Sequence, residues 1–119
     1  MPEFGFILLP VANPAHSAAF YERLLGRPPI EASPSFAMLP LREGMMLGLW
    51  QREGVQPPPD AAPGGSEVAF MAADVDATHA DWAAKGTTIL QPPTDMDFGR
   101  TFTAADPDGH RLRVFKPGR

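Results

Sequence analysis

Cysteine is absent from this chain of 119 residues. Without a thiol, the chain cannot form a disulfide, a thiolate zinc site, an iron–sulfur cluster or a cysteine nucleophile. It also has no apolar run long enough to span a membrane. Lysine and arginine total 10 against 14 acidic residues, so the net charge is −4 and the basic surface typical of nucleic-acid binding is missing. We therefore expect neither a nucleic acid nor a membrane as a partner.

The opening residues, MPEFGF, lack the positive charge that begins a secretory signal. Together with the absence of cysteine, this predicts a cytoplasmic location. Proline is abundant instead, with 15 residues of 119, alongside 11 glycines. The length fits one domain. We expect a folded domain of short elements separated by proline-rich turns.

The first part of the chain, residues 3–52, predicts one module. Its expected elements are a strand over 4–9, a helix over 14–25 and short strands over 35–39 and 45–50. Pro10 should end the first strand or place it at a sheet edge, because proline cannot donate to a ladder. Asn13 and Pro14 suit the N-cap and first position of the helix, and Gly26 suits its C-terminal cap.

The second module, residues 67–117, repeats this order after a proline- and glycine-rich linker at 53–66. Its expected elements are a strand over 67–72, a helix between Asp74 and Lys85, and strands over 87–90, 100–105 and 111–115. We expect Pro92 and Pro93 to end the strand over 87–90. The interval between the N-caps Asn13 and Asp74 nearly equals that between Gly26 and Gly86, which indicates a duplication.

The repeated pattern predicts an α+β fold within a single domain over 1–119. Each half reads β-α-β-β-β, and a half of this size would struggle to bury its own sheet face. We therefore expect two βαβββ modules whose curved mixed sheets surround a ligand cavity.

Three segments resemble signatures of the vicinal oxygen chelate superfamily, which includes glyoxalase I, the extradiol dioxygenases, and the fosfomycin and bleomycin resistance proteins. These are Asn13-x3-Ser17-x2-Phe20-Tyr21-x3-Leu25-Gly26, Glu67-Val-Ala-Phe70-x3-Asp74-Val-Asp-Ala77 and Asp106-Pro-Asp-Gly-His110. The stretch Phe98-Gly-Arg-Thr-Phe102, with Gly48-Leu-Trp50, resembles phenazine-antibiotic resistance members, which bind a planar drug without chemistry. The resemblance implies a homodimer, in which module one of one chain often faces module two of the other. The sequence leaves open whether modules pair within or between chains.

The resemblance also implies where the metal ligands of the enzymes would lie: Phe6, Gly48, Glu67 and Arg113. Phenylalanine and glycine offer no ligand atom, and arginine is a permanent cation. The histidines, His16, His79 and His110, fall on helices or in a turn, away from these strands. We therefore predict no metal, no cofactor and no catalytic residue.

The same positions suggest a ligand-binding site. Glu67 and Arg113 should form an ion pair that orients polar groups of a ligand, or else a purely structural pair. Gly48 should leave flat space beside Trp50 for a planar aromatic, although Trp50 could equally pack in the core or a dimer interface. The candidate ligand-binding residues are Phe36, Met38, Gly48, Trp50, Glu67, Phe98, Arg100 and Arg113. Each of these residues could instead have a purely structural role. Phe36 and Met38 could belong to the core, and Arg100 could lie in a solvated loop.

These observations favour metal-independent binding and sequestration of a small planar aromatic compound, such as an antibiotic. One alternative is a metal-dependent lyase, isomerase or dioxygenase whose ligands lie elsewhere in the chain. Another is a regulator that binds a small metabolite.

Overall fold

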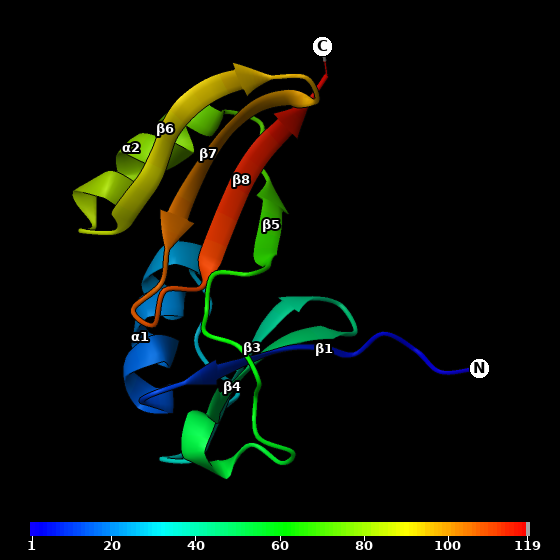
Figure 1. Ribbon diagram of the computed structural model, residues 1–119. Helices are drawn as coiled ribbons and strands as arrows, with labels where there is room; N and C mark the ends of the chain where they lie inside the picture. Colours follow the sequence, from blue (N-terminus) through cyan, green and yellow to red (C-terminus); the bar gives the residue numbers. More distant parts are fainter. Residues whose placement is uncertain (119) are drawn as a thin grey trace. The chain divides into compact units, whose positions relative to one another are not determined.

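The computed structural model describes residues 1–118 as two compact units, one ending at Ala61 and the other beginning at Ala62. Each unit contains one α-helix and a four-stranded sheet (Figure 1). The first comprises β1 (Phe6–Val11), α1 (Pro14–Leu25), β2 (Glu31–Ala32), β3 (Phe36–Arg42), β4 (Met45–Gln51) and a short 3-10 helix η1 (Arg52–Gly54). The second comprises β5 (Glu67–Met71), α2 (Val75–Ala84), β6 (Thr88–Met96), β7 (Gly99–Ala105) and β8 (Arg111–Pro117). The predicted α+β class and the two βαβββ modules are confirmed.

Both sheets have the same strand order. It is β1-β4-β3-β2 in the first unit and β5-β8-β7-β6 in the second. The first strand of each unit pairs parallel to the last, and all other pairs are antiparallel. The first and last strands are therefore neighbours in each sheet, so residues from opposite ends of a module lie side by side on one surface.

The two helices begin as predicted. The side chain of Asn13 accepts a hydrogen bond from the His16 amide at 3.1 Å, and that of Asp74 accepts one from the Ala77 amide at 2.9 Å. These caps satisfy amides that have no partner within the helix. Helix α1 ends at Gly26, whose φ of 76° lies in the left-handed region where glycine carries no steric penalty.

Each helix covers one face of its own sheet. Helix α1 contacts β3 and β4, and Tyr21 on this helix is fully buried. Helix α2 contacts β6, β7 and β8, where Trp82 packs edge-on against Phe70 and Phe102 with ring centroids 6.3 and 5.4 Å apart. Trp82 is 4% exposed and therefore belongs to the core of the second unit. Neither helix of the described residues has the length and apolar character needed to cross a membrane.

The strand boundaries differ from the predictions at proline residues. The prediction that Pro92 and Pro93 break a strand is wrong, because β6 runs through both to Met96. Strand β1 continues through Pro10 to Val11 at a sheet edge, which is the second of the two outcomes expected for Pro10, and β3 extends past Pro40. Strands β1 and β6 lie at sheet edges, and the registers of β3 and β6 shift next to their prolines. Edges and bulges are the places where a missing amide donor costs no ladder hydrogen bond.

Candidate functional site

The first sheet has two different faces. Side chains that point toward α1 are fully buried, as for Val11, Leu47 and Leu49. The large side chains of the opposite parity are only partly covered, because α1 packs on the other face of the sheet. Phe6 and Leu8 are 43% and 48% exposed, and Trp50 is half-buried. This second surface, called here the open face of the first sheet, is apolar and accessible within its unit.

A pocket of about 380 Å³ lies on this open face. The residues that line it are Phe6, Leu8, Ser35, Phe36 and Trp50. Phe36 lies across from Trp50 in the antiparallel β3–β4 register, and Pro10 lies across from Trp50 in the parallel β1–β4 register. Strands β1, β3 and β4 therefore bring three aromatic side chains and the aliphatic side chain of Leu8 to one depression, with Ser35 as its polar member.

Gly48 lies one row away from Trp50, between Leu8 and Met38 in the two registers. A Cβ at this position would lie 2.5 Å from Leu8 Cδ2 and 3.1 Å from Phe36 Cζ. Because Gly48 has no Cβ, the side chains of Leu8 and Phe36 can pack directly over β4 at this position. The space predicted above Gly48 is occupied by Leu8 and Phe36, and the pocket lies beside them, against Trp50.

The open face of the second sheet, on the side away from α2, is charged at its centre. Arg113 donates from Nε to Glu67 Oε1 at 2.6 Å and from Nη2 to Oε2 at 2.9 Å. Nη1 of the same guanidinium donates to Thr101 Oγ1 at 3.2 Å. Arg111 adds a second cation, with Nη2 at 2.8 Å from Glu67 Oε2. The predicted pair of Glu67 and Arg113 is confirmed as an ion pair, and it belongs to a cluster of three charges.

The cluster shifts the titration of its members. The hydrogen bonds from Arg113 lower the pKa of Glu67 below its ordinary value of 4.5, more strongly than partial burial raises it. The same contact raises the pKa of Arg113. Both groups are therefore charged at neutral pH.

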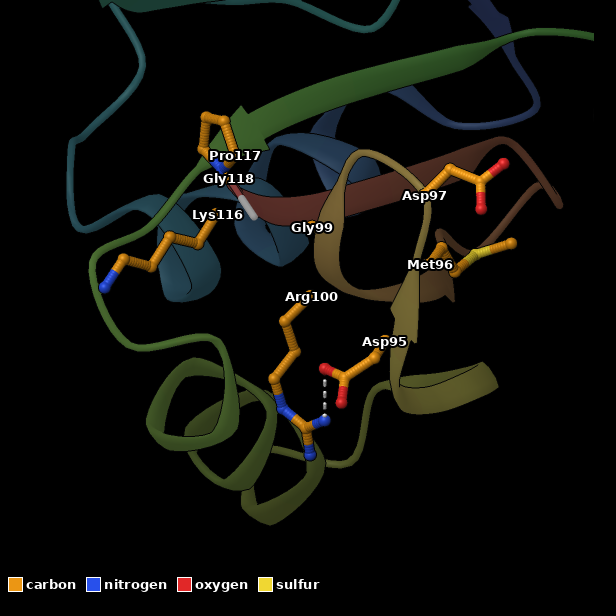
Figure 2. Close-up of a pocket in the computed structure, with 8 residues that line it drawn as sticks. All are labelled: Asp95, Met96, Asp97, Gly99, Arg100, Lys116, Pro117 and Gly118. Carbon is orange, nitrogen blue, oxygen red and sulfur yellow. Dashed lines mark hydrogen bonds and ion pairs between the residues drawn. The ribbon is translucent and has the colours of Figure 1, made fainter.

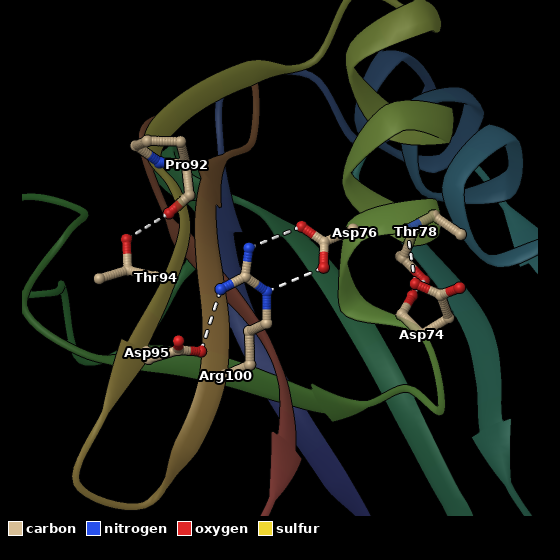
Figure 3. Close-up of polar contacts among 8 residues, drawn as sticks. Asp74, Asp76, Thr78, Pro92, Thr94, Asp95 and Arg100 are labelled. Atoms are coloured by element: carbon tan, nitrogen blue, oxygen red, sulfur yellow. Dashed lines mark hydrogen bonds and ion pairs between the residues drawn. The ribbon is translucent and has the colours of Figure 1, made fainter.

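Arg100 lies on the other face of the second sheet, the one that α2 covers. It donates from Nε and Nη2 to the two carboxylate oxygens of Asp76 at 2.8 and 2.9 Å, and from Nη1 to Asp95 at 3.0 Å (Figure 3). These bonds link the first turn of α2 to β6 and β7. They raise the pKa of Arg100 and lower the pKa of Asp76.

A second depression of about 510 Å³ surrounds the end of the β6–β7 hairpin. Figure 2 shows the guanidinium of Arg100 beside the carboxylate of Asp95, while the side chains of Asp97 and Lys116 extend away from this ion pair. Phe98, in the hairpin turn, does not line this depression. It packs edge-on against Phe115, with ring centroids 6.0 Å apart.

Comparison with known proteins identifies the family. The sequence profile of the Glyoxalase/Bleomycin resistance protein/Dioxygenase superfamily matches residues 3–114. The chain belongs to this superfamily. It is 32% identical over 114 residues to the phenazine antibiotic resistance protein EhpR of Enterobacter agglomerans, covering 90% of this chain and 86% of EhpR.

Solved structures share the fold of this chain. The solution structure of protein ATC0852 from Agrobacterium tumefaciens has a TM-score of 0.88 and 48% identity, and the match covers both chains completely. The crystal structure of TnmS3, an antibiotic binding protein from Streptomyces sp. CB03234, has a TM-score of 0.78 and 21% identity, covering 99% of this chain and 98% of TnmS3. At that identity, the likeness to TnmS3 supports the fold alone.

The positions where the superfamily resemblance places metal ligands do not fit a divalent cation. Phe6 and Gly48 have no donor atom, and both oxygens of Glu67 accept hydrogen bonds from Arg113. Arg113 itself has no lone pair to offer a metal and would repel it. Among residues 1–118, no group of three histidine or carboxylate side chains could hold a metal ion. These four positions therefore do not form a site for a divalent metal.

The structure sorts the candidate site residues into separate groups. Phe36, Met38, Gly48 and Trp50 share the open face of the first sheet, and Glu67 and Arg113 share that of the second. Arg100 lies on the opposite face of the second sheet, and Phe98 lies in a turn. Their roles in ligand binding stay predictions.

Sequence reasoning missed Leu8 and Ser35 in the pocket and Arg111 in the charged cluster, and it considered Phe6 only as a metal position. Leu8 reaches the pocket through the parallel pairing of β1 with β4, which joins residues far apart in the chain. Arg111 could have been found by strand alternation, because it lies two residues before Arg113 on the same strand and therefore on the same face.

Proposed function

We propose that this protein binds a small planar aromatic compound on the open face of the first sheet and sequesters it without a metal. The observation that carries the proposal is the apolar pocket beside Trp50, in which the walls are aromatic and aliphatic and Ser35 supplies a polar group. A flat ring that stacks on an indole gains both buried apolar area and favourable ring–ring geometry. The relationship to EhpR, a phenazine antibiotic resistance protein, supports an antibiotic as the compound.

Protection by sequestration requires binding but no chemical change. The free drug concentration falls by mass action, so the protein must be abundant and its Kd low. The lack of a donor set at the family's metal positions supports binding in the absence of metal. Expression of the protein should then protect sensitive cells, and the drug should be recovered from the complex unaltered.

The test uses fluorescence of the two tryptophans. Trp82 is buried in the core of the second unit, whereas Trp50 lines the pocket. Neutral phenazine should quench the signal of Trp50, and Trp50→Phe should remove the quenching. Ile30→Ala is the matched control, because Ile30 is an exposed apolar residue of the same unit that does not line the pocket, and this variant should bind like the unmodified protein.

The alternatives predict different results. A metal-dependent enzyme would need stoichiometric bound metal, would lose binding after treatment with a chelator and would convert the compound, which mass spectrometry would detect. A metabolite-binding regulator would not bind planar antibiotics, so these compounds would not quench the fluorescence of Trp50. Any of these outcomes would overturn the proposed function.

The proposal includes a homodimer in the cytoplasm, with modules paired within one chain or exchanged between two. Support comes from the edge strand β1, where Phe6 and Leu8 are exposed, and from Phe4 just before it, which is 63% exposed. Exposed apolar side chains at a sheet edge favour association. Sedimentation equilibrium should give twice the chain mass of 12.8 kDa, and a monomer at micromolar concentration would contradict the dimer.

A further inference from the structure

The open face of the second sheet carries two arginines and only one carboxylate. Glu67 lies across from Arg111 in the parallel β5–β8 register, and Arg113 lies two residues further along the same face. Both guanidiniums contact the same carboxylate, at 2.6 Å from Arg113 and 2.8 Å from Arg111. The cluster therefore has one excess positive charge, on a chain whose net charge is −4.

Several donors of the cluster have no partner within the described residues. A guanidinium has five N–H donors. Arg111 contacts Glu67 through Nη2, and its Nε is buried without a hydrogen-bond partner among residues 1–118. Thr103 is 1% exposed, and its hydroxyl likewise has no partner in that range. Leaving such a buried group unsatisfied costs free energy, which a hydrogen bond to a ligand oxygen would recover.

These unsatisfied groups share one surface. Thr103 lies across from Arg113 in the antiparallel β7–β8 register, and paired residues point to the same side of a sheet. The residues flanking the arginines are small: Ala69 lies across from Arg113, and Ala105 lies across from Arg111. Small side chains therefore flank the two arginines on β5 and β7.

Apolar side chains occupy the next row of the same face. Met71 lies across from Phe115 in the β5–β8 register, and Met71 is 70% exposed. The Phe115 ring is held edge-on by Phe98. A flexible thioether next to a fixed aromatic ring offers an adaptable apolar surface for another ring. Charge and apolar area are thus arranged side by side within one unit.

We propose that this face is an oxyanion-binding site that takes an aromatic carboxylate. Arg111, Arg113 and Thr103 bind the carboxylate, and Met71 and Phe115 contact the ring. A monoanion balances the single excess charge, whereas a phosphate dianion would leave an uncompensated negative charge beside Glu67. The inference goes beyond the proposed function, because it uses only residues of the second unit.

The experiment follows the arginine Nε–Hε and backbone amide signals by NMR at about pH 7. The probes are phenazine-1-carboxylate and its carboxamide, which share a ring system and differ in charge. The carboxylate should shift the Arg111 Nε–Hε and Thr103 amide signals and bind about tenfold more tightly than the carboxamide, as one charge-assisted pair implies. Equal affinity for the two probes, or an unmoved Arg111 signal, would overturn the site.

Two variants test the assigned groups. Arg111→Met keeps an apolar stem without the guanidinium, and Thr103→Val removes the hydroxyl at nearly constant volume. Each should reduce the preference for the carboxylate several-fold, while Arg27→Met, an exposed arginine of the first unit, should leave it unchanged. Because Thr103→Val is close to isosteric, it tests the site even if Arg111→Met fails to fold. A preference unchanged in Thr103→Val would contradict the role of its hydroxyl.

Two further controls distinguish the carboxylate site from the pocket beside Trp50 and from a general anion site. Quenching of Trp50 by neutral phenazine with no preference for the carboxylate would defeat only the present inference. Shifts at Arg111 without quenching of Trp50 would defeat only the proposed function. If inorganic phosphate moved the same signals with the affinity of the aromatic acid, the proposed selectivity for an aromatic carboxylate would be wrong.

Discussion

At the scale of single residues, Gly48 shows how an absent side chain shapes the candidate site. Its missing Cβ is the space into which Leu8 and Phe36 lean. Gly48→Ala should push both side chains toward Trp50, narrow the pocket and weaken phenazine binding by about tenfold. The free energy of unfolding should change by less than about 1 kcal/mol, because the exposed end of Leu8 can move and alanine costs less backbone entropy than glycine. Fluorescence titration and urea unfolding measure the two effects.

The control for this substitution is Gly5→Ala. A Cβ at Gly5 would meet nothing within 4 Å, so the variant should bind phenazine like the unmodified protein. Weaker binding in both variants, or unchanged binding in Gly48→Ala, would show that the contacts of Leu8 and Phe36 over β4 do not shape the site.

Some residues of the candidate site could be assigned from the sequence and others could not, for a physical reason. Positions on one strand, such as Gly48 and Trp50, share a face by alternation alone, so they could be placed together in advance. The ion pair of Glu67 and Arg113 was predicted through a family resemblance. The position of Leu8 in the pocket depends on the pairing of β1 with β4, which are distant in the chain. The alternation of side chains along one strand does not specify this pairing. Arg100 was found in an ion pair with Asp76, a residue that becomes its neighbour only when α2 packs on the sheet.

At the scale of elements, the two helix starts offer a matched comparison. Asn13→Ala and Asp74→Ala each remove the acceptor of one amide in the first turn. Each should lower the free energy of unfolding by about 1 kcal/mol, measured by urea unfolding followed by circular dichroism. The conservative variants Asn13→Ser and Asp74→Asn should retain most of the stability. Equal losses in the alanine and conservative variants would contradict a capping role.

The β6–β7 hairpin depends on Gly99. Its φ of 138° disfavours any residue with a Cβ, and a Cβ there would collide with the backbone carbonyl oxygen of Lys116. Because the backbone of β8 cannot move as a flexible side-chain end does, Gly99→Ala should destabilise the protein by more than about 2 kcal/mol. Thermal unfolding measures this loss. Gly65→Ala, where a Cβ would meet nothing within 4 Å, should have little effect, and similar melting temperatures for both variants would contradict the argument.

The elements were more predictable than their ends. Helix α1 ended where Gly26 indicated, because a left-handed cap is a local property of the chain. Strand β6 did not end at Pro92, because whether a proline is tolerated depends on the edge position of its strand. Strand β2, of two residues, carried no recognisable pattern of its own. Edge positions are set by the assembled sheet and not by the local sequence.

At the scale of the whole molecule, the equal spacing of the helix caps predicted a duplication. The structure has this duplication as the same strand order in both sheets. The parallel pairing of first and last strands places β8 beside β5, which brings Glu67 into contact with arginines from the other end of its module. The resulting charge cluster joins chain segments that are 46 residues apart. Its contribution should therefore appear in the global stability of the protein and in its dependence on pH.

The sign of that dependence follows from the lowered pKa of Glu67. The folded protein holds this carboxylate ionised at a pH where the unfolded chain, with an ordinary pKa of 4.5, has begun to bind a proton. The stability from this group is therefore fully present above that ordinary value, and it is lost as the pH falls through the lower folded-state pKa. At neutral pH the contribution should be on the order of 1 kcal/mol, because the pair is charge-assisted but partly exposed to solvent.

Glu67→Gln tests this directly. Urea unfolding from about pH 7 down to about pH 3 should show the variant less stable than the unmodified protein at neutral pH, with the difference shrinking as the solution becomes acidic. Arg113→Gln removes the arginine that is the main cause of the lowered pKa of Glu67. It should therefore also weaken the pH dependence of the free energy of unfolding, although less completely, because Arg111 still contacts Glu67. A Glu67→Gln curve that runs parallel to that of the unmodified protein over the whole range would mean that this carboxylate has the same pKa in the folded and unfolded states.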